Sequence, residues 1–288
     1  MTTTQEQTQT QTHPIVGQQR IIELIDSLLS PDTPLPHTLL HGPAGTGKTT
    51  IANYIATKQQ QQGSSLVSSS GPMIRSNGDI IKLLLNLKPQ GVIFIDEIHS
   101  IPSRVQEVLY YPLEQGTLEI TAGLTKQLPP FTMIAATTNP AKLSDPLRSR
   151  FPLVLRVDPY SEDDLSFIAS KKAPSLTDDA ASNIAAMANG VPRNVSTLIQ
   201  VLLANYKNET TITTQMVSEV ALKLGLNSNG LREEHLKYIK ALHTLQHASL
   251  STLASALNED ISTITDIIEP PLIRMGIVRK TSKGRSLV

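Results

Sequence analysis

Short apolar runs alternate with helical patterns along the first half of the chain. The runs that fit buried strands are 37–42, 91–97 and 131–138, and the helical patterns are 18–29 and 49–59. Strands that alternate with helices in this way are typical of a parallel sheet whose strands are joined by crossover helices. The pattern therefore predicts an α/β core from residue 16 to about residue 158.

The second half of the chain is helical up to about residue 224. Ser161 and Thr177 stand where a side-chain oxygen can cap the first turn of a helix, and Gly190 is expected to end the second helix. Residues 226–288 carry three further helical stretches, followed by "GIVRK", the turn "TSKG" and "RSLV". This order predicts a helix-turn-helix closed by a β-hairpin.

These patterns divide the chain into four predicted segments. Residues 2–13 are nearly all Thr and Gln, too polar to bury a core, so we expect a disordered tail at the start. The predicted segments are the tail 1–13, an α/β domain 14–158, a small helical domain 159–225 and a helix-turn-helix domain 226–288.

Composition narrows the class of protein. The chain has 288 residues, of which 39% are hydrophobic and 17% charged, as in ordinary soluble globular proteins. It has no cysteine, which excludes disulfides and thiolate metal sites. No apolar run approaches the roughly 18 residues of a membrane span, and the start lacks the blocks of a signal peptide. We expect a cytoplasmic protein with no membrane partner.

The segment "GPAGTGKT" fits the spacing of a phosphate-binding loop, with an apolar strand before it and a helical pattern after it. Glycines allow backbone N–H groups to turn toward phosphate oxygens, and the following helix presents its positive end. Lys48 is expected to reach the terminal phosphates of ATP and Thr49 to bind Mg²⁺. The candidate binding residues are Gly42, Gly45, Thr46, Gly47, Lys48, Thr49 and Thr50.

Two carboxylates follow the apolar run in "VIFIDEIH". Asp96 is expected to hold the metal and Glu97 to polarise an attacking water, although acids at this point can also simply cap a helix. Their place behind a second strand, after the phosphate loop, favours ATP hydrolysis. The neighbouring His99 is expected to be a hydrogen-bonded or solvated bystander.

The run "MIAATTNP" ends in hydroxyl and amide groups that could sense the terminal phosphate. Thr138 is the first choice and Asn139 the second, and ordinary turn chemistry at the end of a strand is the alternative. In "DPLRSRF" we favour Arg150 over Arg148 as an arginine that reaches a nucleotide bound to a second subunit. The alternative for this pair is a set of surface salt bridges.

Arg193 stands near the start of a helical pattern in "GVPRNVSTLIQ", where the helix dipole repels a cation. An anion should offset that repulsion, either a nucleotide γ-phosphate or a local carboxylate. Residues 274–285 hold five cations and no acid, although the whole chain has 25 basic and 25 acidic residues. In a helix-turn-helix with a hairpin, we expect Arg279, Lys280, Lys283 and Arg285 to contact the DNA backbone. The alternative is a solvated hairpin.

With these residues in place, the chain resembles the AAA+ ATPases and, more closely, the RuvB family of Holliday-junction branch-migration motors. The similar blocks include "LLHGPAGTGKTT", "VIFIDEIH", "PLRSRF", "GVPRNVSTLI" and "EPPLIRMGIVRKTSKGR". The resemblance implies an α/β fold: an AAA+ P-loop core with a parallel sheet, a helical lid domain and a C-terminal winged helix. It also implies a hexameric ring around double-stranded DNA and ATP-driven branch migration in recombination and repair.

The resemblance assigns roles to the residues that match the family's motifs. They are Lys48, Thr49, Asp96 and Glu97 as Walker residues, Thr138 as sensor 1, Arg150 as arginine finger, Arg193 as sensor 2, Tyr160 beside the adenine, and Val16 and Gly17 near the base.

One segment departs from the family. After Ile120 the family usually carries a longer apolar β-hairpin that docks RuvA, whereas here only "TAGLTKQ" remains, which puts docking of a RuvA-type partner in doubt. Two other functions stay open at this point: a nucleotide-switched DNA-binding initiator that does not translocate, and a clamp-loader-like factor, against which the winged helix argues.

Overall fold

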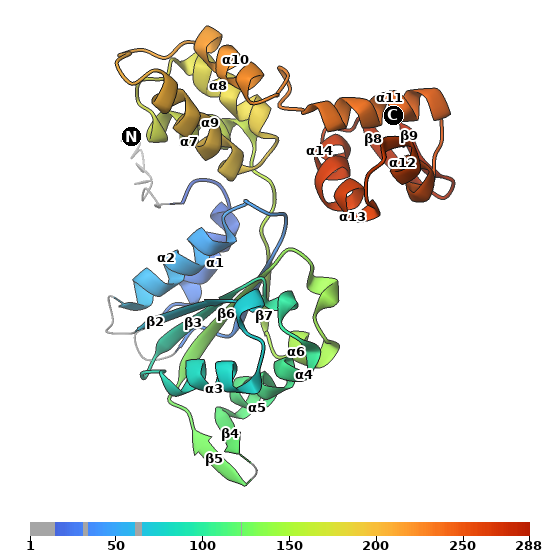
Figure 1. Cartoon of the computed structure of the whole chain (residues 1–288). Helices are drawn as coiled ribbons and strands as arrows, with labels where there is room; N and C mark the ends of the chain where they lie inside the picture. Colours follow the sequence, from blue (N-terminus) through green and yellow to red (C-terminus); the bar gives the residue numbers. More distant parts are fainter. Residues whose placement is uncertain (1–14, 31–33, 61–64, 122) are drawn as a thin grey trace, which may run out of the picture. The chain divides into compact units, whose positions relative to one another are not determined.

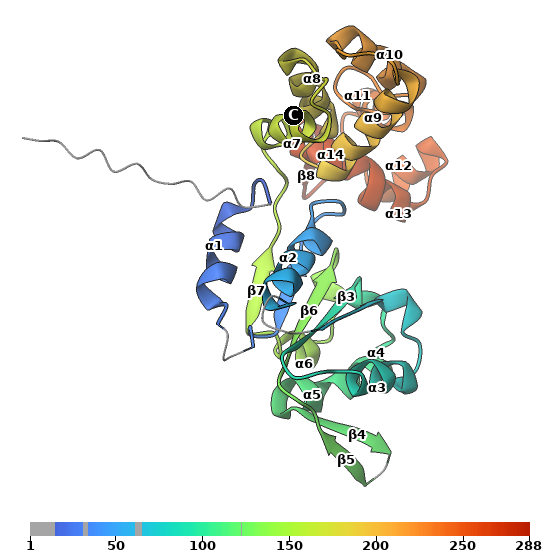
Figure 2. The same cartoon turned by 90° about the vertical axis from the view of Figure 1, so that its left-hand side faces the viewer.

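The computed structural model describes residues 15–30, 34–60, 65–121 and 123–288. It divides into two compact units, Met1–Asp158 and Pro159–Val288. The predicted tail 1–13 lies outside the described residues. Figures 1 and 2 show the chain from two directions. The predicted four-segment division of the chain stays a prediction.

Five parallel strands form the centre of the first unit, in the order β2-β3-β6-β1-β7. The strands are β1 (Thr38–His41), β2 (Leu66–Ser70), β3 (Gly91–Asp96), β6 (Phe131–Thr137) and β7 (Leu153–Arg156). Parallel pairing places all their carboxyl ends at one edge of the sheet, where Asp96 pairs with Ser70 and His41 with Thr137. This edge is where ligands bind in open α/β sheets.

Helices cover both faces of this sheet (Figure 1). One face is covered by α1 (Gln19–Leu28) and α2 (Lys48–Gln60). The other face carries α3 (Asn77–Leu85), α4 (Ser103–Gln106), α5 (Tyr110–Gln115) and α6 (Asp145–Arg148). Two separate apolar clusters result, one on each face, because alternate residues of the strands point to opposite sides. The predicted α/β core is confirmed.

Two strands of the sheet, β2 and β7, were not among the predicted ones. Both are edge strands that pair on one side only. Half-exposed residues dominate β2, which ends in three serines, and β7 has only four residues, of which Val154 is 48% exposed. An edge strand need not be apolar throughout, and β2 accordingly lacks the continuous hydrophobic run of a central strand, whereas β7 has three apolar residues in a row but is short.

A two-stranded antiparallel hairpin, β4 (Thr117–Thr121) and β5 (Leu124–Gln127), extends away from the sheet in both views (Figures 1 and 2). This is the shortened segment noted in the sequence. All four residues of β5 are exposed, including Leu124, whose exposed fraction is 55%. Three of the four exposed residues of β5 are polar, so the surface of this strand is mostly polar.

The second unit begins with four helices, α7 (Glu162–Lys172), α8 (Asp178–Ala188), α9 (Pro192–Asn205) and α10 (Thr214–Lys223). Both predicted N-caps are present: Ser161 Oγ accepts from the Asp164 N–H at 3.1 Å and Thr177 Oγ1 from the Ala180 N–H at 3.3 Å. Helix α8 ends at Ala188, and positive φ angles follow at Asn189 and Gly190. These helices share one apolar cluster.

The last part of the chain forms the predicted winged helix. It comprises α11 (Glu233–Leu245), α12 (Leu250–Leu257), a continuous segment of α13 (Ile261–Thr263), a π-helical turn (Ile264–Ile268) and α14 (Glu269–Arg274), and the hairpin β8 (Val278–Thr281) and β9 (Gly284–Leu287). The winged helix has its own apolar core, which is separate from the core shared by α7–α10. Within the described chain, no helix is long and apolar enough to cross a membrane.

Candidate functional site

The phosphate-binding loop connects β1 to α2 and is held from several sides. Gly42 donates its N–H to the Thr137 carbonyl at 3.3 Å, and it has a φ of 150°. A Cβ at this position would lie 2.2 Å from the Val157 carbonyl oxygen, so only glycine fits. Thr46 is fully buried and donates its hydroxyl to the Pro43 carbonyl at 2.9 Å. The loop is therefore a fixed structure.

The inside of this loop is suited to an anion. Among the described residues, the N–H groups of Gly45, Thr46 and Gly47 donate to no protein acceptor. Lys48 is only 6% exposed, and its ammonium donates to the carbonyls of Gly42 and Pro43 at 2.9 and 2.8 Å. Free N–H groups beside a helix N-terminus and a lysine form a cradle for phosphate oxygens. Thr50 is exposed in the first turn of α2.

Oxygen ligands for a divalent cation stand next to the loop. Thr49 donates its hydroxyl to Asp96 Oδ2 at 3.4 Å, and Asp96 is the last residue of β3. Hydroxyl and carboxylate oxygens are the hard ligands that Mg²⁺ prefers, and it usually takes its remaining ligands from water and nucleotide phosphates. These two residues therefore fit the metal that the sequence implies.

Glu97 stands in a left-handed conformation directly after β3, with φ of 47° and ψ of 47°. Its Oε2 accepts the Thr138 N–H at 3.2 Å and the Thr138 hydroxyl at 3.1 Å. The predicted general base and the predicted sensor thus contact each other directly. Gly71, the residue directly after β2, packs closely against this turn, because a Cβ there would lie 2.1 Å from the Glu97 carbonyl oxygen.

His99 belongs to the same cluster. Its Nδ1 lies 3.1 Å from Glu97 Oε2 and 2.9 Å from Thr137 Oγ1, and its side chain is 15% exposed. The Thr137 hydroxyl also accepts the Asn139 N–H at 3.0 Å. The expectation of a hydrogen-bonded residue is confirmed, and the bond goes to the predicted general base itself. A histidine two residues after the acid was the signal in the sequence.

Another histidine lies at the entry to the phosphate loop. Burial, followed by the nearby charge of Arg156, lowers the pKa of His41 below its usual value. His41 is the last residue of β1, so a neutral ring at this point avoids adding a second cation beside Lys48.

Arg148 and Arg150 both form ion pairs within their own subunit. Arg148 Nη2 lies 2.7 Å from Asp145 Oδ1, and Arg150 Nη2 lies 2.7 Å from Glu114 Oε2. The side chains differ in exposure, at 48% for Arg148 and 22% for Arg150. The alternative of salt bridges is therefore realised for both, and the role of Arg150 at a second subunit stays a prediction.

The remaining predicted nucleotide contacts lie in both units. Val16 and Gly17 precede α1 in the first unit, where Gly17 has a φ of 66°. In the second unit Tyr160 packs against the cluster of α7–α10, and burial, followed by the nearby Asp164, raises its pKa to about 12. Arg193 is exposed in the first turn of α9, and no described carboxylate lies within ion-pair distance of it. Their nucleotide roles stay predictions.

The basic hairpin of the winged helix contains an internal ion cluster. Glu269 is fully buried, and Arg285 Nε donates to its Oε1 at 2.8 Å, while Lys280 Nζ lies 3.2 Å from its Oε2. The Tyr238 hydroxyl donates to the same carboxylate at 2.8 Å. Burial alone would raise the pKa of Glu269, but hydrogen bonds from Arg285, Tyr238 and Lys280 outweigh it and hold the pKa below its usual value.

This ion cluster engages two of the four residues that were predicted to contact DNA, Lys280 and Arg285. The side chain of Arg285 is only 16% exposed, and that of Lys280 is 53% exposed. Lys283 is exposed in the two-residue turn between β8 and β9, and Arg279 is exposed with Nε donating to Ser286 Oγ at 3.1 Å. The DNA contacts stay predictions, and the geometry favours Arg279 and Lys283.

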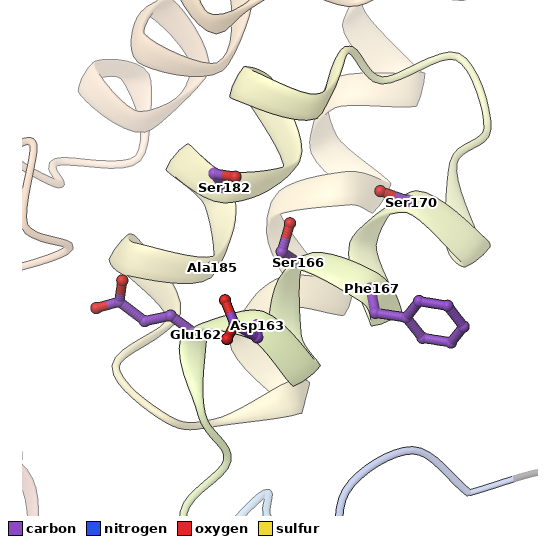
Figure 3. Close-up of a pocket in the computed structure, with 7 residues that line it drawn as sticks. All are labelled: Glu162, Asp163, Ser166, Phe167, Ser170, Ser182 and Ala185. Atoms are coloured by element: carbon purple, nitrogen blue, oxygen red, sulfur yellow. The ribbon is translucent and has the colours of Figure 1, made fainter.

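A pocket of about 360 Å³ lies between α7 and α8 in the second unit (Figure 3). Its lining residues are Glu162, Asp163, Ser166, Phe167, Ser170, Ser182 and Ala185. The ring of Phe167 points away from Ser182 in Figure 3. Two carboxylates at the start of α7 repel phosphates, so this pocket is unsuited to a nucleotide.

A phosphate loop after β1, an acidic pair after β3 and a hydroxyl after β6 lie at one edge of a parallel sheet, in a chain that ends in a winged helix. This combination defines a AAA+ ATPase. The family model "Holliday junction DNA helicase RuvB P-loop domain" matches residues 9–157, and the model "RuvB C-terminal winged helix domain" matches residues 228–288. The chain belongs to the RuvB family.

Individual relatives agree with this assignment. The chain is 36% identical to a Holliday junction branch migration complex subunit RuvB from Oenococcus oeni, over 94% of this chain and 85% of that protein. It is 38% identical to the subunit of the same name from Campylobacter fetus, over 88% of this chain and 77% of that protein. The solved Thermotoga maritima RuvB Holliday junction branch migration motor has a TM-score of 0.82 and 31% identity, over 95% of this chain and 92% of that one.

Proposed function

We propose that this chain is the ATPase subunit of a motor that translocates double-stranded DNA and drives the migration of Holliday junctions. The carrying observation is that the similarity to branch migration subunits extends over 94% of the chain, with the complete set of phosphate-loop and acidic residues in place. A switch that only binds DNA is not favoured, because the relatives bear the name of branch migration subunits.

The proposed hydrolysis follows from the geometry of the first unit. The phosphate loop and Lys48 bind the β- and γ-phosphates, and Glu97 orients and deprotonates the attacking water. Mg²⁺ held by Thr49 and Asp96 would neutralise charge on the phosphates. Thr138 would sense the γ-phosphate, and its hydrogen bond to Glu97 supports this role by linking the two residues.

The proposed assembly is a ring of several copies, six by the family resemblance, in which Arg150 of one subunit stabilises charge at the nucleotide of the next. Removal of such a finger typically costs about 10³–10⁵ in turnover. Each chain carries both the proposed nucleotide site and Arg150, so identical copies can join head to tail and close into a ring.

The test is ATP hydrolysis and branch migration of a synthetic four-way junction, measured for the wild type and for Lys48→Ala, with and without a RuvA-type protein. We expect the wild type to hydrolyse ATP faster with DNA and to resolve the junction, and Lys48→Ala to do neither. The arms with and without a RuvA-type protein show whether the short β4–β5 hairpin still recruits that partner. Binding of junctions without any movement under all conditions would contradict the proposal.

A further inference from the structure

The guanidinium of Arg150 is held on several sides within its own subunit. Nε donates to the Tyr110 carbonyl at 3.2 Å, and Nη2 donates to Glu114 Oε2 at 2.7 Å. Nη1 donates to the Pro146 carbonyl at 2.5 Å. The ring of Tyr110 lies beside the group, with its centroid 4.6 Å from Cζ. Three acceptors and one aromatic face together determine where the plane of the guanidinium lies.

The support of Arg150 is itself connected to the chain segment that carries it. The Tyr110 hydroxyl lies 3.0 Å from Ser144 Oγ, and Ser144 caps α6 by accepting the Leu147 N–H at 3.4 Å. Arg150 follows α6, with its own N–H donating to the Leu147 carbonyl at 3.1 Å. Helix α5, which carries Tyr110 and Glu114, is therefore linked to α6 both at its cap and at the arginine.

The contacts leave part of the guanidinium available. A guanidinium has five N–H donors, and each of the three nitrogens of Arg150 has one engaged with a protein oxygen. One N–H on Nη1 and one on Nη2 remain, in a side chain that is 22% exposed. These two N–H groups remain as donors for an oxygen of a bound anion such as a phosphate.

Arg148 shows what an arginine on the same segment looks like without such support. Its one described ion pair is with Asp145, three residues earlier, and the side chain is 48% exposed. A local pair of this kind leaves a long side chain free to move, and exposed pairs contribute little. Arg150 differs because two of its three acceptors, in Glu114 and Tyr110, come from 36 and 40 residues earlier in the chain.

We propose that Glu114 and Tyr110 are positioning residues that orient Arg150 before a second copy of this chain presents its nucleotide. This inference rests on the proposed function, because it takes Arg150 to act at the nucleotide of a neighbouring subunit. A side chain that is already oriented loses less conformational freedom when it binds the transition state, which raises turnover without changing how tightly ATP binds.

The test compares Glu114→Gln with Asp145→Asn, which removes the equivalent carboxylate from Arg148. We expect Glu114→Gln to lower the kcat of DNA-stimulated ATP hydrolysis about three- to tenfold, because a neutral amide accepts a weaker hydrogen bond than a carboxylate. KM, melting temperature and ring formation should stay as in the wild type. Asp145→Asn should stay within about twofold of the wild-type kcat. Tyr110→Leu should lower kcat further, and Tyr110→Phe, which keeps the ring, should lower it less.

Mixed assemblies separate positioning from a general structural effect. Lys48→Ala subunits keep a supported Arg150 but have no working phosphate loop, so next to a Glu114→Gln subunit they supply the arginine that its nucleotide needs. We expect turnover per Glu114→Gln site to rise toward the wild-type value in the mixture. A defect that is not rescued in this way would be a defect of the subunit's own site and would overturn the proposal.

Two further outcomes would also overturn it: a kcat of Glu114→Gln equal to or above that of the wild type, and an equal loss in Asp145→Asn. Arg150→Ala separates the proposed role of Arg150 at the neighbouring nucleotide from the positioning role of Glu114 and Tyr110. If Arg150→Ala keeps normal turnover, the assignment of Arg150 in the proposed function fails, and the positioning role fails with it. If Arg150→Ala is inactive and Glu114→Gln is normal, only the positioning role fails.

Discussion

Charged side chains are used differently at the sheet edge of the first unit and in the wing of the second. Lys48, Asp96 and Glu97 lie at the carboxyl ends of parallel strands, next to the predicted site for phosphates. In the wing, Lys280 and Arg285 both turn to the buried Glu269. In the first region Lys48 lies at the predicted phosphate site and donates to carbonyls of its own loop. In the second, half of the expected cations neutralise a buried acid of their own domain.

The comparison shows when a residue's charge is informative by itself. At the sheet edge, the spacing of the motif and the strand before it determine where each side chain lies, so residue type and position together predict the chemistry. In a basic hairpin, the partner of each cation depends on which acid the fold brings beneath it. That acid lies 16 residues earlier in the chain than Arg285.

The largest effect is expected from a substitution at the sheet edge of the first unit, measured as a loss of kcat. Glu97→Gln removes the proposed base while keeping the shape and a hydrogen bond to Thr138, so kcat should fall about 10²–10⁴-fold, the usual contribution of a general base. ATP binding, measured by nucleotide titration of the same variant, should stay within about threefold of the wild type because the phosphate loop is untouched. A variant that hydrolyses ATP at the normal rate would remove Glu97 from the chemistry.

The second prediction concerns the stability of the wing. Glu269→Gln leaves Arg285 and Lys280 without their counter-charge, and removing one partner of a buried ion pair costs about 3–5 kcal/mol. We expect the free energy of unfolding to fall by about 2–3 kcal/mol, at or below the low end of that range, because Lys280 is half exposed and the amide still accepts from Tyr238. Chemical denaturation of the full chain, followed by a probe in the winged helix, measures it.

Glu233→Gln is the matched control, because Glu233 pairs with Lys237 at the exposed surface of α11, where the loss of an ion pair should change stability far less. The stability contributed by Glu269 also depends on pH, in a direction that follows from its pKa. The pKa of Glu269 is lower in the folded state, so the stability it contributes is present above the unfolded pKa of about 4.5 and is lost as the pH falls below it. The difference between wild type and Glu269→Gln should therefore shrink at acid pH, and a constant difference would contradict the ion cluster.

Much of the nucleotide site could be predicted from the sequence because its chemistry depends on short segments. The phosphate loop, the acidic pair and Thr138 each follow directly on an apolar strand, and parallel strands bring their carboxyl ends together. Of the two edge strands that were missed, β2 has only two apolar residues before its serines, and β7 has three apolar residues but is only four residues long. The contacts of Glu114 and Tyr110 with Arg150 could not be predicted, because nothing local in the sequence indicates a partner from another helix.

The winged helix was predicted as a fold, but not which of its cations are free. The order of helices and the turn between β8 and β9 follow from local patterns, and these are confirmed. A signal for the buried acid was present: Glu269 stands between apolar residues and a pair of prolines, at a position where an acid needs a partner. Identifying Arg285 as that partner requires the cross-strand register, which pairs Lys280 with Arg285 on one side of the hairpin.

The smallest effect is expected in the salt dependence of DNA binding when single cations of the wing are replaced. Each phosphate contact contributes about −0.9 to the slope of log affinity against log salt, so four contacts would give about −3.6 and two about −1.8 from the wing. Arg279→Ala and Lys283→Ala should each make the slope for duplex DNA shallower by about 0.9, because both side chains are exposed at the hairpin. Lys280→Ala should change it by less, since its ammonium lies 3.2 Å from Glu269. Equal changes for all three variants would show that the ion cluster opens when DNA binds, and the distinction between the two regions would then hold only for the free protein.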